Sequence, residues 1–190
     1  KLTPPQLESV VQFLSNAATN AAPTASTNNC GPDQQGRPAG NPFQQPHWNG
    51  WGVDLSQSRF QPAAMAQLTA AQVPVLKLKW AFGFPGVTQA YGQPTVVGNR
   101  LFVGTAGRKV YSLNASNGCQ YWAFDTEAQV RAAISVAVNG AAWVAYIGDQ
   151  RANVYAVDAW TGSLLWKRRI DDHAGAVITE AEFLARRESV

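Results

Sequence analysis

The sequence predicts an all-β protein: a partial β-propeller of about two four-stranded blades, preceded by a short N-terminal helix and a linker. Three observations predict it. Trp80, Trp122 and Trp166 recur at spacings of 42 and 44 residues. Between successive tryptophans lie about four short β-type runs, and Gly-containing turn pairs separate them. A period of roughly 40–50 residues with four strands per unit is typical of a propeller blade, whereas helical solenoids lack the alternation. Closure takes four to eight blades, so two cannot close alone.

The expected strands follow one another from the middle of the chain to near its end. Alternation of apolar and polar residues, together with β-branched and aromatic side chains, marks each of them. The turn pairs include Gly98-Asn99, Asn117-Gly118 and Thr161-Gly162, which tolerate the positive φ of tight hairpins. The runs are residues 75–82, 94–104, 109–114, 119–124, 133–138, 141–148, 153–158 and 163–170.

Composition and charge exclude several other classes of protein. A 46% hydrophobic share suffices for a core, and the 14% charged share is low. The net charge is +3, and the one dense basic group is Lys167–Arg169. We interpret that group as a solvated strand edge that discourages strand addition, since nucleic-acid binding would need a broader basic face with aromatics. No apolar run approaches the roughly 18 residues of a membrane helix.

Two segments precede the predicted blades. Residues 2–16 predict a helix, because Thr3 can cap it and Leu7, Val10, Val11 and Leu14 form one apolar face. A lone helix of this length is marginal in water, so the face needs a partner. Residues 17–46 contain no Val, Ile, Leu or Met, which predicts a linker or a segment lying on the surface.

An eleven-residue pattern is written twice. Residues 156–166 read AVDAWTGSLLW, and residues 112–122 read SLNASNGCQYW. Asp158 is expected to accept hydrogen bonds from turn amides two or three residues later, and Gly162 to turn the chain. Trp122 and Trp166 are expected to spread apolar area against a neighbouring blade. We therefore interpret these residues as scaffold, in preference to a catalytic acid or a cofactor platform.

The cysteines and histidines suggest no metal centre. Cys30 and Cys119 form no C-x-x-C pair, so either they make one disulfide or they are two unrelated thiols. His47 and His173 are far apart in the chain, and a metal site needs more ligands.

The second copy of the pattern resembles a known family. AVDAWTGSLLW matches the tryptophan-docking motif A-x-D-x-x-T-G-x-x-x-W of quinoprotein alcohol dehydrogenases, which also occurs in related non-catalytic propellers. WNGWGVDLSQSRFQPA (48–63) resembles the segment that leads into their first blade, and residues 76–105 look like that blade. Within this family the chain resembles the polyvinyl-alcohol dehydrogenase group of quinohaemoproteins. Residues 1–16 then resemble the last helix of a cytochrome c domain, 17–46 a linker and 47–179 the first blades. The resemblance covers nearly all of residues 1–179.

The resemblance implies a chemistry. Such enzymes oxidise an alcohol with pyrroloquinoline quinone (PQQ) as hydride acceptor and Ca²⁺ as Lewis acid, pass electrons to a cytochrome c, and work in the periplasm. Arg131 resembles the arginine that pairs with PQQ oxygens, although an exposed strand-end arginine is an equal alternative. Tyr91 stands where some members carry a glutamate, and Thr179 approaches the propeller axis in the family. Cys30 and Cys119 would tie the linker to the first blade.

Two departures limit what the resemblance implies. The haem motif C-x-x-C-H is absent, and the family's calcium ligands and catalytic aspartate lie in later blades, so no catalytic or metal residue is assigned here. The family continues with Gly-Ser-Pro where this chain reads EAEFLARRESV, an atypical tail over 180–190 that suggests an interrupted reading frame, a truncated gene or a boundary artefact. We expect a catalytically incomplete piece of such an enzyme. A non-catalytic propeller scaffold and a fragment without function are the alternatives.

Overall fold

A computed structural model describes residues 3–5, 8, 12, 28–34, 40–52, 58–139 and 142–179. Its described core is two four-stranded antiparallel sheets, which confirms the predicted all-β fold class. The first sheet contains β1 (Thr95–Val97), β2 (Arg100–Gly104), β3 (Lys109–Asn114) and β4 (Gln120–Asp125). The second contains β5 (Ser135–Asn139), β6 (Ala142–Gly148), β7 (Asn153–Asp158) and β8 (Leu164–Arg169). Short helices lie outside the sheets: η1 (Pro32–Gln34), η2 (Pro42–Gln44), α2 (Ala63–Ala66) and η3 (Ala70–Val75).

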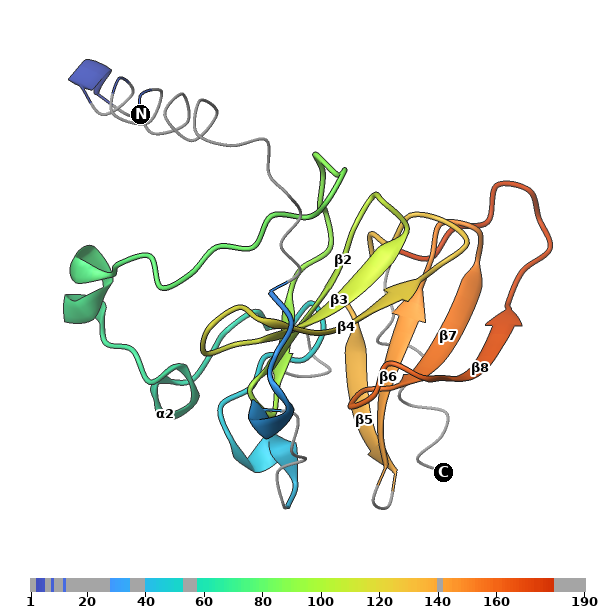
Figure 1. Cartoon of the computed structure of the whole chain (residues 1–190), viewed down its shortest axis with the longest axis horizontal. Coiled ribbons are helices and arrows are strands. Elements are labelled where there is room, and N and C mark those ends of the chain that lie inside the picture. The colour runs from blue at the N-terminus through green and yellow to red at the C-terminus, as the bar shows by residue number, and fades with distance from the viewer. Residues whose placement is uncertain are drawn as a thin grey trace.

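Each sheet is a simple meander in which sequential strands are hydrogen-bonded neighbours. The two sheets lie beside each other in the order of the chain, as Figure 1 shows. Gly98 and Asn99 have φ values of 59° and 62°, so they make the tight β1–β2 turn that their residue types predict. Register shifts fall at Ser112/Leu113 and at Ala156/Val157, 44 residues apart, so the two sheets repeat even their irregularities.

The main core lies between the two sheets. The first sheet contributes Phe102 and Trp122, and the second contributes Trp143, Ile147 and Tyr155. All five are no more than 8% exposed. The large aromatic side chains therefore fill the space between neighbouring blades, as their repeat predicts.

The repeated pattern forms the same clasp in both sheets. The Asp158 carboxylate accepts hydrogen bonds from the backbone N–H groups of Trp160 (2.9 Å) and Thr161 (2.8 Å), which closes the turn after β7. On that turn rests Trp122 of the preceding sheet, whose Nε1 donates to the carbonyl oxygen of Ala159 at 3.2 Å. One repeat earlier, Trp80 donates in the same way to Ala115 at 3.1 Å. The clasp thus joins each unit to the one before it.

Gly162 is the point of closest approach in this clasp. Its φ is +78°, and a Cβ added there would lie 2.8 Å from Cγ of Trp122. We expect Gly162→Ala to lower the free energy of unfolding by about 2–4 kcal/mol, because backbone strain adds to displacement of the indole. Gly86→Ala is the matched control, since Gly86 has φ +67° with nothing within 4 Å. Urea denaturation measures both, and equal losses would mean that the Trp122 contact contributes nothing.

The strand predicted over residues 75–82 is wrong for this chain. Val75 ends η3, and residues 76–84 form no strand in the part of the chain that the structure describes. Leu76 and Leu78 are 62% and 80% exposed, whereas Trp80 packs on the first sheet. Trp80 docks on the first sheet in the same way as Trp122 of β4 docks on the second. Residues 76–84 therefore lie beside the first sheet at the position that β4 has beside the second. A strand needs a hydrogen-bonded neighbour, and no described residues supply one.

Part of the predicted linker packs against the first sheet. Cys30 and Cys119 form a disulfide next to β4, and the backbone of Asn29 bridges to Gln120 in parallel. At the other edge, Trp48 exchanges two backbone hydrogen bonds with Val96 of β1, at 2.8 and 2.7 Å. The predicted helix over 2–16 falls largely outside the described residues, and the tail over 180–190 falls wholly outside them. None of the helices in the described parts is long and apolar enough to cross a membrane.

Candidate functional site

Tyr91, Arg131 and Thr179 occupy equivalent places in three successive repeats. Backbone hydrogen bonds define the equivalence: Ala106 N–H donates to Gln89 O at 3.2 Å, as Gln150 N–H donates to Gln129 O at 3.0 Å. A second set of equivalent bonds extends the correspondence to the third repeat. Val130 N–H donates to Thr105 O and Ile178 N–H donates to Asp149 O, both at 3.1 Å. Tyr91 and Arg131 each lie four residues before the first strand of a sheet, β1 or β5. The three residues therefore lie in equivalent segments at one end of the sheets.

Tyr91 and Arg131 are in direct contact. The Arg131 guanidinium carbon lies 4.8 Å from the centre of the Tyr91 ring, a cation–π geometry. Their segments approach closely because Gly92 has no side chain: a Cβ there would lie 3.1 Å from the carbonyl oxygen of Ala132. Tyr91 is 49% exposed, so one side of this pair remains open to solvent.

Thr179 belongs to the same region. Its neighbour Ile178 is buried and packs with Ala132, the residue after Arg131. Trp51 reaches Thr179 from the segment that precedes the sheets, donating from Nε1 to the Thr179 carbonyl oxygen at 3.3 Å. Sequence reasoning did not single out Trp51 or Gly92. The signal that could have found Gly92 is the AYG–VRA alignment at an offset of 40 residues.

The chemistry of this cluster suits an oxygen-rich, anionic ligand. Among the described residues Arg131 forms no ion pair, so its charge is open to a carboxylate or quinone oxygen. The Tyr91 phenol and the Thr179 hydroxyl add neutral hydrogen-bonding groups. No group of three or more His, Cys, Asp and Glu residues occurs in the described ranges, so the cluster provides no metal ligands there. The cluster thus offers one positive charge and neutral hydrogen-bonding groups, but no carboxylate or imidazole that could accept a proton.

A buried carboxylate supports the loops around the cluster. Asp149 is fully buried, and its carboxylate accepts hydrogen bonds from Asn153 Nδ2 at 2.9 Å and from the Tyr155 hydroxyl at 2.8 Å. It also accepts from the backbone N–H groups of Arg151 and Asn153. Burial alone would raise the pKa of Asp149, but these four donors outweigh it and lower the pKa below its ordinary value of 3.8.

The lowered pKa of Asp149 has a consequence for acid stability. Its contribution is fully present above pH 3.8, and it is lost as the pH falls through the lower pKa of the folded state. We expect Asp149→Asn to be less stable than wild type at pH 7 and to lose less further stability on acidification below pH 4. Denaturant unfolding at several pH values measures this, with the exposed Asp33→Asn as control. Parallel acid profiles for wild type and Asp149→Asn would contradict the assignment.

The fold and the clasp together define a class of protein. Four-stranded antiparallel meanders that pack in series are blades of a β-propeller. The tryptophan that docks on the next repeat agrees with the quinoprotein motif to which residues 156–166 bear a resemblance. Residues 48–189 match the family model described as "Outer membrane protein assembly factor BamB". The chain belongs to this family of PQQ-type repeats, and the predicted kinship with quinoprotein alcohol dehydrogenases is confirmed by its relatives.

Those relatives are curated alcohol dehydrogenases. The chain is 46% identical to a polyvinylalcohol dehydrogenase of Pseudomonas sp, over 70% of this chain and 21% of the relative. It is 39% identical to a polyvinylalcohol dehydrogenase of Sphingopyxis sp. (strain 113P3), over 70% of this chain and 20% of the relative. The chain thus spans about a fifth of the length of the curated relatives it matches.

Solved structures show the same fold. The quinohemoprotein alcohol dehydrogenase from Comamonas testosteroni superposes with a TM-score of 0.58 at 22% identity, covering 82% of this chain and 24% of that one. A europium-containing methanol dehydrogenase superposes with a TM-score of 0.55 at 21% identity, covering 69% of this chain and 24% of that one. At this identity the likeness concerns the fold.

Proposed function

We propose that the chain is the N-terminal part of a PQQ- and calcium-dependent alcohol dehydrogenase that oxidises alcohols, including polymeric ones, to carbonyl compounds. The observation that carries the proposal is the cluster of Tyr91, Arg131 and Thr179 at equivalent positions of three repeats, in a chain whose relatives are named for this activity. Among the described residues the cluster offers no proton acceptor and no metal ligands, so we expect the chain by itself to be catalytically incomplete.

Each residue of the cluster has a task in this proposal. Arg131 binds a carboxylate or carbonyl oxygen of PQQ through charge-assisted hydrogen bonds, and Tyr91 holds its guanidinium in place. The Thr179 hydroxyl offers a further hydrogen bond from the third repeat. PQQ, if held by these residues, would supply a hydride acceptor for the alcohol carbon. The calcium ligands and the general base then come from blades outside these residues.

The proposal includes an arrangement of segments. Residues 1–16 end a cytochrome c-like domain that carries haem c, 17–46 are a linker, 47–179 form the first blades, and 180–190 are an atypical tail. Residues 76–84, which form no strand here, take the place of an outer strand beside the first sheet. Support for that role comes from Trp80, which docks as Trp122 does. Electrons leave to a cytochrome c. A disulfide suits an oxidising compartment such as the periplasm.

A binding and activity experiment tests the proposal. PQQ and Ca²⁺ are added to a polypeptide that extends this chain to the length of the curated relatives, and PQQ affinity and dye-linked alcohol oxidation are measured. We expect Arg131→Gln to weaken PQQ binding about 10–100-fold, the effect of one charge-assisted pair. Arg168→Gln, an exposed arginine on β8, is the matched control. Failure of the longer protein to bind PQQ, or equal affinity in both variants, would overturn the proposal.

One observation favours a second candidate, a non-catalytic propeller that serves as an assembly scaffold. The matching family model carries the description of an outer membrane assembly factor, not of an enzyme. The same experiment separates the two: a longer protein that folds but neither binds PQQ nor oxidises alcohols favours the scaffold.

A further inference from the structure

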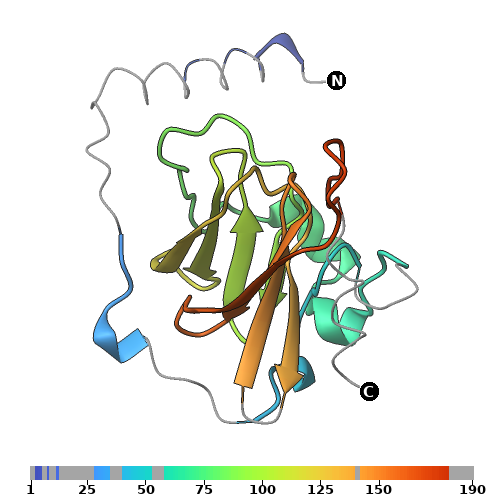
Figure 2. The same ribbon diagram turned by 90° about the vertical axis from the view of Figure 1, so that its right-hand side faces the viewer.

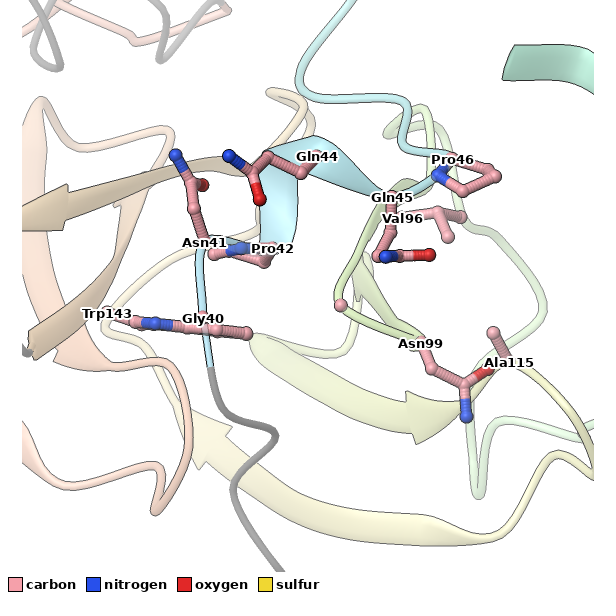
Figure 3. Close-up of a pocket in the computed structure, with 11 residues that line it drawn as sticks. Gly40, Asn41, Pro42, Gln44, Gln45, Pro46, Val96, Asn99, Ala115 and Trp143 are labelled. Atoms are coloured by element: carbon pink, nitrogen blue, oxygen red, sulfur yellow. The ribbon is translucent and has the colours of Figure 1, made fainter. Parts of the chain in front are cut away.

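A pocket lies at the opposite end of the sheets from the Tyr91–Arg131 pair. It has a volume of about 400 Å³, within the size range of small-molecule sites. Gly98 and Asn99 in the β1–β2 turn line it, whereas Tyr91 and Arg131 precede β1 and β5. One side of it is formed by residues 40–46 of a segment that we call the strap, residues 40–49 (Figure 3).

The strap is held firmly where it leaves the pocket. The backbone of Trp48 pairs with Val96 of the first sheet. The Asn49 side chain bonds both backbone groups of Val136 in the second sheet: Nδ2 donates to the carbonyl oxygen at 2.9 Å, and Oδ1 accepts from N–H at 2.8 Å. These contacts tie the end of the strap, next to the pocket, to both sheets.

The pocket lining combines carboxamides with apolar groups. Asn41, Gln44, Gln45 and Asn99 contribute the carboxamides, and none of the described residues that line the pocket is charged. Figure 3 shows the carboxamides of Asn41 and Gln44 at one end and that of Asn99 at the other. Prolines of the strap, Val96 and Trp143 supply the apolar surface between them.

This lining selects a chemical class of ligand. A charged ligand would find no counter-charge there. Asn41 Oδ1 already accepts from Phe43 N–H and Asn99 Oδ1 from Ser116 Oγ, so the Gln44 and Gln45 carboxamides are the ones that an apolar ligand would strip of water without replacing their hydrogen bonds. A carboxamide both donates and accepts, and so does a hydroxyl group. The fitting ligand is therefore neutral and carries hydroxyl groups along an apolar backbone.

The position of Trp143 distinguishes between two kinds of hydroxylated chain. Sugar rings stack on open aromatic faces, but Trp143 is only 4% exposed and packs edge-to-face on Trp160 at 5.6 Å. A flexible aliphatic chain needs no open ring face. We propose that the strap pocket binds a neutral aliphatic polyol, as a second site that holds a polymeric alcohol away from the oxidising centre. The choice of a polymeric alcohol rests on the proposed function.

The test is a titration of the ¹⁵N-labelled 190-residue chain, monitored by NMR. The probes are short polyvinyl alcohol, polyethylene glycol, whose ether oxygens accept but do not donate, and a malto-oligosaccharide. We expect saturable shifts of the side-chain amides of Asn41, Gln44, Gln45 and Asn99 with polyvinyl alcohol only. Gln45→Glu places a charge in the pocket and should weaken binding at least about threefold to tenfold. Gln67→Glu, at an exposed glutamine outside the pocket, should leave it unchanged.

Several outcomes would overturn the inference. These are no shift with polyvinyl alcohol, equal shifts with polyethylene glycol, a stronger response to the sugar, or equal weakening by Gln45→Glu and Gln67→Glu. The titration needs no cofactor, so its result is independent of catalysis. Shifts at the pocket without alcohol oxidation by the longer protein would count against the proposed enzyme alone. Oxidation without shifts would count against the pocket alone.

Discussion

Replacing Trp122 by alanine is expected to lower the free energy of unfolding by about 3–5 kcal/mol, as for other large buried aromatics. Trp122 is 8% exposed, contacts Phe102 in its own sheet and donates to Ala159 in the next. Its loss therefore removes packing within one blade and a bond between two. Guanidinium denaturation followed by circular dichroism measures the effect. Trp122→Phe keeps much of the apolar contact but loses the hydrogen bond, so it should cost about 1–2 kcal/mol and remain measurable if the alanine variant does not fold.

Trp166 provides the comparison, because it is the same residue of the pattern one repeat later. It is half-buried, and its ring centre lies 6.1 Å from that of Tyr146. In the described residues it does not dock on the turn of a following repeat. Trp166→Ala should therefore cost less than half as much as Trp122→Ala in this chain. In a protein extended by the next blade, the two losses should become similar. Equal losses in the present chain would contradict the docking role of Trp122.

Removing the disulfide by the double replacement Cys30→Ser with Cys119→Ser is expected to cost about 4 kcal/mol. The two cysteines are 89 residues apart, and a cross-link over so long a loop strongly restricts the unfolded chain. Thermal or chemical unfolding under non-reducing conditions measures the change. Proteolysis should also cut residues 28–34 faster, because the bond holds that segment on β4.

Reduction by dithiothreitol is the control for the cysteine replacements. It should destabilise the wild type about as much as the double replacement does, and it should leave the double variant unchanged. Equal stability of the oxidised wild type and the double variant would mean that the link contributes nothing to the fold.

The turns and clasps that recur in each repeat could be predicted from the sequence. The Gly98-Asn99 turn and the Asp158 clasp depend on a few adjacent residues, so their types determine their geometry. The strand over residues 75–82 could not be judged in the same way. Its alternation is real, but a strand forms only against a neighbour, and whether one is present is not written in the segment itself.

The candidate site was predictable to a similar degree. The family resemblance pointed to Tyr91, Arg131 and Thr179 as separate candidates, without indicating that they lie together. The contact of Arg131 with Tyr91 and the approach of Trp51 to Thr179 depend on how three distant segments meet. The disulfide was an open alternative for the same reason, because spacing alone does not tell whether two cysteines meet in space.

The way in which Trp48 and Asn49 cover the inner strands has a consequence for self-association. Trp48 forms backbone hydrogen bonds with Val96 of β1. The Asn49 side chain bonds the backbone N–H and carbonyl groups of Val136 in β5, as a neighbouring strand would. Residues 28–30 cover β4, and the exposed Lys167–Arg169 run repels strands approaching β8. Each of the four edge strands thus has a feature that disfavours edge-to-edge pairing with another chain. Further sheets are therefore expected to associate through their faces, as these two sheets do, rather than through their edges.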